Sequence, residues 1–221
     1  MTFSTEWNIR YKKNTHMSIW PWVELISHFM KFYDPKKSKV NILELGCGAG
    51  ANIPFFLSLK TEYFGIDGSQ IIIKNLKKRF PNIKNNLVAI DFTKEIPFER
   101  KFDFIIDRSA ITHNPTNEIK NIMDLVHQKL SKNGIYIGID WFSTKNSEYK
   151  NGVKTTDPFT KNNFKTGPFK KVGNVHFSNK KHLLNIFEKF KIEVLEEKTT
   201  KRKIPNDNKI AATWNIIAKK K

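Results

Sequence analysis

Residues 40–50 read VNILELGCGAG, a short apolar run that passes into a loop with three glycines. The apolar run is typical of a buried β-strand. Glycines at alternate positions, Gly46, Gly48 and Gly50, allow the backbone to turn sharply and to approach a ligand that a Cβ atom would exclude. Residues 51–59 have a helical pattern, and the free N–H groups at the start of a helix favour an anionic ligand. The stretch therefore predicts a strand, a ligand-binding turn and a helix.

Strands and helices alternate along most of the chain. Short apolar runs predict strands at residues 40–45, 61–66, 86–90, 102–106, 135–140, 192–197 and 209–218. Apolar residues at helical spacing predict helices at residues 18–32, 51–59, 69–80, 117–130 and 182–190, the first of them capped by Ser18. This alternation is typical of an α/β protein with a parallel sheet, and the last two strands are expected to pair antiparallel at its edge. Such sheets bind ligands at the carboxyl ends of their strands.

The chain is expected to form one domain with four segments. They are an N-terminal cover segment (1–35), a ligand-binding core (40–141), a lid or acceptor insertion (142–178) and a C-terminal helix with an edge hairpin (179–221). The insertion lacks periodicity and is rich in Lys, Asn, Gly and Pro, as functional lids and disordered loops are. Its aromatic residues Phe159, Phe164 and Phe169 favour a folded lid.

Composition argues against several classes of protein. Hydrophobic residues make up 39% of the 221 residues, and no apolar run approaches the roughly 20 residues that a membrane-spanning helix needs. Residues 1–13 lack the apolar stretch of a secretory signal. The single cysteine, Cys47, cannot form an internal disulfide or a zinc cluster. We therefore expect a cytoplasmic protein without a metal site.

The net charge of +18 has two interpretations. One is an anionic partner, such as nucleic acid, a phosphorylated sugar or an acid. The other is a genomic bias, because the excess is mostly Lys accompanied by many Asn and Ile residues, which AT-rich codons supply. The lysines are scattered along the chain, which favours the second interpretation. Only residues 145–181 stand out, with nine Lys against Glu148 and Asp157.

Acidic residues lie at the ends of three predicted strands. Glu44 lies near the end of the first strand, and Asp67 follows the second strand, 23 residues later. A carboxylate at this second position can accept hydrogen bonds from both hydroxyls of a ribose. Asp91 follows the third strand and can reach the exocyclic amine of an adenine, with Phe92 beside the ring. These positions describe a nucleoside with a polar tail, which fits a dinucleotide or S-adenosylmethionine (SAM).

The motif residues resemble those of the class I SAM-dependent methyltransferase family. The family's first motif is an acid followed by three alternate glycines, as in Glu44 and the loop after it, and its fourth motif matches Asp107. A dinucleotide loop would place its last glycine where this chain has Ile53. The resemblance covers residues 40–141 and implies a Rossmann-like sheet of seven mostly parallel strands, with SAM as the cofactor and methyl donor. The alternative is a structural turn with incidental acids, in which Cys47 is only a small residue.

The resemblance also implies which residues bind the cofactor. They are Glu44, Gly46, Cys47, Gly48, Gly50, Asp67, Gly68, Ser69, Asp91, Phe92, Asp107, Arg10 and Tyr11. Arg10 and Tyr11 belong to an N-terminal segment that folds over SAM in related small-molecule methyltransferases, and they are expected to meet its carboxylate. The tryptophans near them, at positions 7, 20 and 22, are also explained by packing in the core.

His113 and Asp107 are the candidate catalytic residues. Methyl transfer requires alignment of the acceptor with the methyl group and, for some acceptors, a base. His113 lies six residues past Asp107, in a loop that faces the methyl group in the family, which suits a base or an acceptor-orienting group. An alternative is that His113 caps the following helix with Asn114 and Thr116.

Three residues are candidates for binding the acceptor. Arg108 can bind a carboxylate or phosphate, or can simply pair with a nearby acid. Asp140, which follows the fifth strand, can bind a hydroxyl or an amine. His176 lies in the lid and can contact the acceptor, and the alternative is a surface histidine in a loop.

Three stretches also resemble methyltransferases encoded with bacterial surface-glycan genes: Thr15-His16-Met17-Ser18, residues 46–52 and residues 107–114. This resemblance implies a polar or anionic acceptor, such as a sugar, a nonulosonic acid or a nucleotide-linked sugar, methylated on an O or N atom. A tRNA or rRNA methyltransferase is favoured by charge alone, and the chain has no appended RNA-binding module. Two further hypotheses are an NAD(P) oxidoreductase and a non-catalytic SAM-binding protein, and the intact glycine loop argues against the latter.

Overall fold

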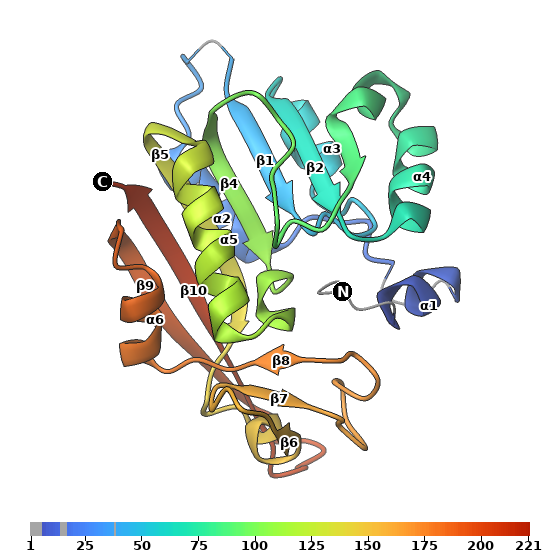
Figure 1. The fold of residues 1–221 in the computed structure, drawn as a ribbon, viewed down its shortest axis with the longest axis vertical. Helices are drawn as coiled ribbons and strands as arrows, with labels where there is room; N and C mark the ends of the chain where they lie inside the picture. The colour runs from blue at the N-terminus through green and yellow to red at the C-terminus, as the bar shows by residue number, and fades with distance from the viewer. Residues whose placement is uncertain (1–5, 14–16, 38) are drawn as a thin grey trace.

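The computed structural model describes residues 6–13, 17–37 and 39–221, and its centre is a seven-stranded sheet (Figure 1). The strands follow the order β3 (Leu87–Ala89), β2 (Glu62–Asp67), β1 (Asn41–Leu45), β4 (Phe102–Arg108), β5 (Leu130–Phe142), β10 (Ile210–Lys220) and β9 (Phe190–Lys201). Strands β1 to β5 are parallel, and β10 runs antiparallel to both β5 and β9. This arrangement confirms the predicted Rossmann-like sheet with its antiparallel edge hairpin.

Helices cover both faces of the sheet and bury an apolar core on each face. One core holds α5 (Thr116–Lys129) and α6 (Lys180–Ile186), and the other holds α2 (Val23–Phe32), α3 (Ile53–Ser58) and α4 (Gln70–Arg79). The 3₁₀ helices η1 (Pro81–Asn86), η2 (Ile111–His113) and η3 (Ser147–Lys150) lie in the connections. Residues 42–45 of β1 are all buried between the two cores, which is why that strand is apolar on both sides.

Two predicted boundaries are wrong for local reasons. Helix α2 begins at Val23 and not at Ser18, because Pro21 disfavours a helical conformation at the residue before it. Trp22 takes the capping position without a side-chain hydrogen bond. Residues 131–134, which separate the predicted helix from the predicted strand, belong to β5, where the register with β4 shifts and Asn133 has a φ of 64°.

The insertion between β5 and α6 forms a small sheet of its own. Its strands β6 (Val153–Lys154), β7 (Thr160–Asn162) and β8 (Val175–His176) pair antiparallel, and they lie beyond the carboxyl ends of β1 and β4 in Figure 1. We call residues 143–178 the lid. Phe164, Phe169 and Phe177 are buried in a separate apolar cluster inside it. The lid therefore has its own small core.

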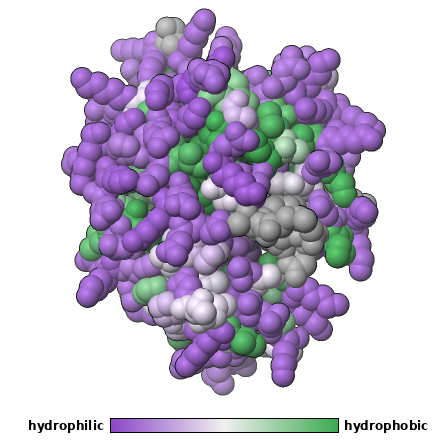
Figure 2. All heavy atoms as spheres, viewed as in Figure 1, coloured by the Kyte–Doolittle hydropathy of each residue, from purple (hydrophilic) through white to green (hydrophobic). Residues whose placement is uncertain are grey.

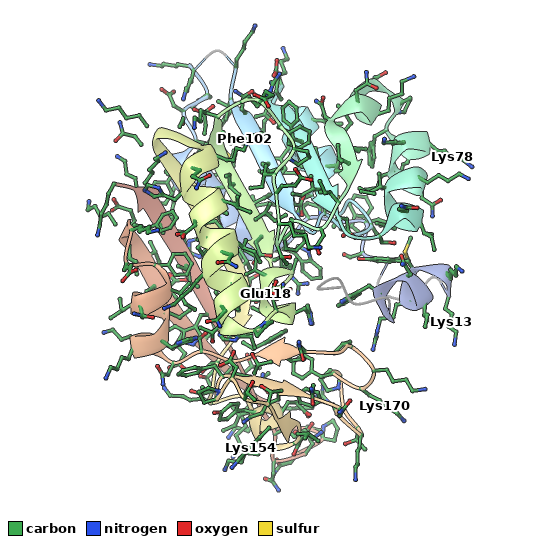
Figure 3. The ribbon with its side chains drawn as sticks, in the orientation of Figure 1. Lys13, Lys78, Phe102, Glu118, Lys154 and Lys170 are labelled. Carbon is green, nitrogen blue, oxygen red and sulfur yellow. The ribbon has the colours of Figure 1, made fainter. Side chains whose placement is uncertain are left out.

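The surface is mostly polar and its positive charge is spread out. The face in Figure 2 is largely hydrophilic, and no helix in the part of the chain described is long and apolar enough to cross a membrane. Lys13, Lys78, Lys154 and Lys170 project from four separate segments of the molecule in Figure 3.

Candidate active site

A cavity of about 580 Å³ lies at the carboxyl ends of the parallel strands. It is lined by the loop after β1, by the ends of β2 to β5, by helix α1 (Glu6–Lys12), by the lid and by the β9–β10 hairpin. Because β3 and β9 are the two edges of the sheet, the cavity extends along most of its width. It contains most of the residues that the sequence predicted for the cofactor.

The glycine loop after β1 forms the floor of this cavity. Gly46 has a φ of 66°, and a Cβ atom there would lie 2.2 Å from the Cβ of Ala110, so only glycine fits. The N–H of Gly48 donates to Asp67 over 3.0 Å. Gly50 does not line the cavity, and its prediction as a direct cofactor contact is not supported. It is glycine because a Cβ there would lie 2.7 Å from the side chain of Leu76 on α4.

Cys47 lines the cavity as a small buried residue. Burial raises the pKa of its thiol, so the thiol stays protonated. A protonated, buried thiol is a poor nucleophile, which argues against a catalytic cysteine.

Two buried carboxylates lie at the tips of β1 and β2. Glu44 accepts hydrogen bonds from the hydroxyl of Tyr63 at 2.5 Å and from Nδ2 of Asn52 at 2.8 Å. Asp67 accepts from the backbone N–H of Ser69 at 2.8 Å, as well as from the glycine loop. Burial raises the pKa of Glu44 to about 7 and that of Asp67 to about 6. A cationic ligand would stabilise the ionised form of both carboxylates.

Asp91 and Phe92 complete this end of the cavity. Asp91 follows β3, and its carboxylate accepts from the N–H and the hydroxyl of Thr93 at 3.1 and 2.7 Å. Gly68 also lines the cavity. No Lys or Arg among the described lining residues comes from this side of the sheet, so three acids face a space that suits a cation. The glycine loop after β1, together with acids at the ends of three strands, fits a nucleoside ligand that carries a positive charge.

Ser69 and Arg10 anchor the cover of the cavity and do not line it, so their predicted contact with the cofactor is not supported. Ser69 is fully buried, caps α4 and donates to Asn8 of α1 at 2.6 Å. Arg10 donates to the carbonyl of Lys170 in the lid at 2.6 Å. Both side chains lie outside the cavity lining because their hydrogen bonds join α1 to the rest of the molecule.

Tyr11 does line the cavity, as predicted for the N-terminal segment. It is 8% exposed, and burial together with the charge of Asp67 raises the pKa of its hydroxyl well above the usual range. The hydroxyl therefore remains a hydrogen-bond donor at the glycine loop. Trp7, one turn earlier in α1, lines the cavity beside it.

Asp107 is buried beneath the cavity and does not line it, so its position does not support the predicted catalytic and cofactor-binding roles. It is 1% exposed and accepts from the backbone N–H groups of Ala110 at 2.8 Å and Ile111 at 3.1 Å. The indole N–H of Trp141 donates to it at 2.7 Å. These bonds turn the carboxylate under the loop that follows β4, so Asp107 holds the loop that carries His113.

His113 lines the cavity from the short helix η2. Its Nδ1 lies 3.0 Å from the carbonyl oxygen of Asn174 in the lid. Because a carbonyl only accepts, Nδ1 carries the hydrogen and Nε2 is the basic nitrogen of the neutral ring. Helix α5 begins after Pro115 without a side-chain cap, so His113 does not cap it.

Arg108 and Asp140 form an ion pair on the cavity wall. Nε and a terminal nitrogen of Arg108 lie 3.0 and 2.9 Å from Oδ2 of Asp140. The guanidinium lies 3.4 Å from the ring centre of Trp22. Both predicted acceptor residues therefore face the cavity, paired with each other.

His176 is buried and does not line the cavity, so its position does not support the predicted contact with the acceptor. It is fully buried within the lid, where Nδ1 lies 3.1 Å from the hydroxyl of Thr160 and Nε2 lies 3.1 Å from Nε2 of His182. Burial lowers its pKa, although Asp157 opposes the shift, so the ring is neutral. Strand β8 turns this side chain toward α6. No cluster of metal-ligating side chains occurs within the described ranges.

Sequence reasoning missed the residues that close the far end of the cavity. They are Ser18, Trp22, Phe142, Pro168, Phe169, Val172, Lys198, Thr200, Ala211 and Thr213. Lys198 and Thr200 belong to β9, which continues past its predicted end at 197 to Lys201, whereas Ala211 and Thr213 lie within the strand predicted at residues 209–218.

The model of a family described as a methyltransferase domain matches residues 42–134. The match runs from β1 through α5 and includes the glycine loop, Asp67, Asp91 and His113. No curated protein sequence matches the chain.

Several solved structures share the fold. A SAM-dependent methyltransferase from Methanosarcina mazei has a TM-score of 0.67 at 17% identity, over 90% of this chain and 98% of that one. The N-methyltransferase NodS from Bradyrhizobium japonicum, in complex with S-adenosylhomocysteine, has a TM-score of 0.64 at 12% identity, over 99% of each chain. A 1,6-didemethyltoxoflavin-N1-methyltransferase from Burkholderia thailandensis has a TM-score of 0.60 at 14% identity, over 89% of this chain and 75% of that one. Residues 42–134 are thus similar to a methyltransferase domain, and the chain shares the fold of SAM-dependent methyltransferases, which indicates S-adenosylmethionine as the cofactor.

Proposed function

We propose that the protein transfers the methyl group of S-adenosylmethionine to an O or N atom of a small polar acceptor. The observation that carries this proposal is a single cavity in which the cofactor acids, the basic ring of His113 and the Arg108–Asp140 pair face one another. One cavity of this kind can hold donor, base and acceptor together.

The acids at the tips of β1 to β3 hold the cofactor in this proposal. Asp67 accepts hydrogen bonds from the ribose hydroxyls, and Asp91 accepts from the adenine amine beside Phe92. Glu44 adds a negative charge beneath the glycine loop, and Tyr11 covers the loop from α1. S-adenosylmethionine, when bound, supplies an electrophilic methyl group on a cationic sulfur.

His113 is the base in this proposal. Its Nε2 takes the proton from the acceptor oxygen or nitrogen, while Nδ1 donates to the carbonyl of Asn174 and orients the ring. The ring packs edge-on against Trp7, with centroids 5.1 Å apart, and lies 6.2 Å from Phe142. These aromatic walls exclude water from the reaction.

The size and polarity of the acceptor follow from the walls of the cavity. Arg108 and Asp140 offer hydrogen bonds to a polar molecule. NodS and the toxoflavin enzyme are N-methyltransferases by name, which supports a small acceptor. A sugar, nonulosonic acid or nucleotide-linked sugar is our specific suggestion. It rests on the surface-glycan resemblance, of which Thr15 and His16 lie outside the described residues.

Isotope-labelled S-adenosylmethionine, incubated with the protein and a cell extract, tests this proposal. We expect the label in a small molecule that passes an ultrafiltration membrane and is identified by mass spectrometry. Label retained in an RNase-sensitive fraction would instead indicate an RNA methyltransferase. Cofactor binding in calorimetry without any labelled product would indicate a non-catalytic SAM-binding protein.

A further inference from the structure

The β9–β10 hairpin forms the far wall of the cavity. Lys198 pairs with Thr213 and Thr200 pairs with Ala211 across the two strands, and all four residues line the cavity. Thr213 is also paired with Phe142, the last residue of β5, so the hairpin continues past the end of that strand. This wall lies at the opposite edge of the sheet from β3 and the cofactor acids.

Charge is distributed unevenly along the cavity. The acids Glu44, Asp67 and Asp91 line it on the side of β1 to β3, whereas Arg108 and Lys198, the Lys and Arg residues among its described lining, come from β4 and β9. The cation of the cofactor therefore belongs at one end, and the other end presents two positive groups together with the carboxylate of Asp140, which also lines the cavity and pairs with Arg108.

A carboxylate of the chain already interacts with both positive groups. Glu24 of α2 accepts a hydrogen bond from Lys198 and does not itself line the cavity. That hydrogen bond lowers the pKa of Glu24, and the charge of Arg108 lowers it further, so one carboxylate lies within the influence of both cations. The side chains of Lys198 and Glu24 are each 39% exposed. An exposed pair contributes little to stability and can be exchanged for a ligand.

Arg108 is held in a position from which it can bind an anionic ligand. Trp22 supports one face of its guanidinium and Asp140 binds one edge, as described above. A guanidinium has several N–H donors in a rigid fork, so its remaining edge suits a planar carboxylate or a phosphoryl group. The hydroxyls of Thr200 and Thr213 add donors on the hairpin side.

We propose that the space between Arg108 and Lys198 is a subsite for an anionic group, a carboxylate or a phosphoryl group, on the acceptor. The inference rests on the proposed function and narrows its substrate class to acidic or phosphorylated small molecules. The anionic group takes over the hydrogen bond of Lys198 from Glu24. The rest of the acceptor extends toward His113, where the reacting atom lies.

Calorimetry with three hexose probes tests the subsite in the full chain saturated with S-adenosylhomocysteine. Glucose 1-phosphate and glucuronate are expected to bind, and neutral glucose at the same concentration is not. Lys198→Met should weaken binding of the two anions roughly 10- to 100-fold, the range for a charged hydrogen bond. Lys198→Arg should restore binding because it keeps the charge.

Lys201→Met is the matched control, because it removes the same charge from the same strand at a residue that does not line the cavity. It should leave anion binding unchanged. Equal losses in both Met variants would show a general effect of net charge, and anions that bind no better than glucose would show that the subsite does not exist. Titration of every variant with S-adenosylhomocysteine beforehand shows whether it is folded and binds the cofactor product. The assay with isotope-labelled S-adenosylmethionine tests the proposed function separately.

Discussion

Asp67 is held in place by two backbone N–H groups and turns its remaining acceptor capacity toward the cavity. Asp67→Ala should weaken S-adenosylmethionine binding roughly 10- to 100-fold, because it removes a charged acceptor for the ribose hydroxyls. Calorimetry measures the loss, and circular dichroism checks the fold. Asp103→Ala is the control, because Asp103 follows the first residue of β4, far from the cavity lining. Wild-type affinity in Asp67→Ala would remove the ribose role.

His113 is expected to act on the acceptor and not on the cofactor. His113→Ala should lower kcat by about 10²- to 10⁴-fold, the usual contribution of a general base, and leave the Kd of S-adenosylmethionine within a factor of about three. His127→Ala is the matched control, since His127 lies in the last turn of α5 and outside the cavity. Full turnover in His113→Ala would exclude it as the base.

Residues set by local geometry could be predicted from the sequence. Glu44, Asp67 and Asp91 lie at strand tips, and the tips of parallel strands meet at one edge of the sheet. Asp107 could not be placed, because its partner Trp141 is distant in sequence and holds the carboxylate beneath the loop. His176 could not be placed, because its side chain is fixed by Thr160 of the paired strand β7 and by His182 of α6.

At the scale of elements, Asp157 fastens the lid to the start of α5. Its carboxylate accepts from the N–H of Thr116 at 2.7 Å and from the hydroxyl of Thr160 at 2.8 Å. Asp157→Asn should lower the free energy of unfolding by about 1–3 kcal/mol, because it weakens charged hydrogen bonds. That change corresponds to a Tm lower by roughly 2–4 °C per kcal/mol.

Thermal unfolding at several pH values checks this prediction. Burial raises the pKa of Asp157, but hydrogen bonds from His176, Thr116 and Thr160 outweigh it and hold the pKa far below the usual 3.8. A carboxylate with a lowered pKa stabilises the fold at pH values above its pKa in the unfolded chain, and this contribution is lost as the pH falls. The difference in Tm between wild type and variant should therefore be full at pH 7 and shrink below about pH 4. Asp207→Asn, which affects a weak exposed pair with Arg202, should change Tm little. Equal Tm values for wild type and Asp157→Asn would contradict the fastening role.

Elements with continuous apolar runs were predicted nearly to the residue, whereas short paired strands were not. Strand β1 begins one residue later than expected, at Asn41. Strands β6 and β8 have two residues each and exist through pairing with β7, so no local pattern reveals them. Pairing between distant segments is the information that a local pattern lacks.

At the scale of the whole molecule, cofactor binding should depend on pH. The raised pKa values of Glu44, about 7, and Asp67, about 6, mean that the folded protein without ligand holds their protons more tightly than the unfolded chain. Their contribution to stability is therefore full at low pH and is lost as the pH rises through 6 to 7. A cationic cofactor favours the ionised carboxylates, so its binding should strengthen over the same range.

Thermal shift assays with and without S-adenosylmethionine measure this effect. We expect the increase in Tm caused by the cofactor to be larger at pH 8 than at pH 5.5. Glu44→Gln, which keeps a neutral group of similar shape, should reduce the difference. A cofactor-induced shift that stays constant across this range would mean that the buried acids do not respond to the charge of the cofactor.

The topology of the molecule was predictable, and the closure of its cavity was not. Each strand-helix unit is read from neighbouring residues, and connection rules then leave few arrangements of the sheet. The walls of the cavity come from α1, the lid and the β9–β10 hairpin. Helix α1 lies more than a hundred residues before the other two and meets them only in the folded chain.

The hydrogen bond from His113 to the carbonyl of Asn174 makes the readiness of the base depend on the lid. The imidazole is thereby restricted to the tautomer whose lone pair is on Nε2. A lid that did not reach His113 would leave both tautomers accessible to the ring. In the proposed function, the backbone of Asn174 therefore decides which ring nitrogen can accept the proton.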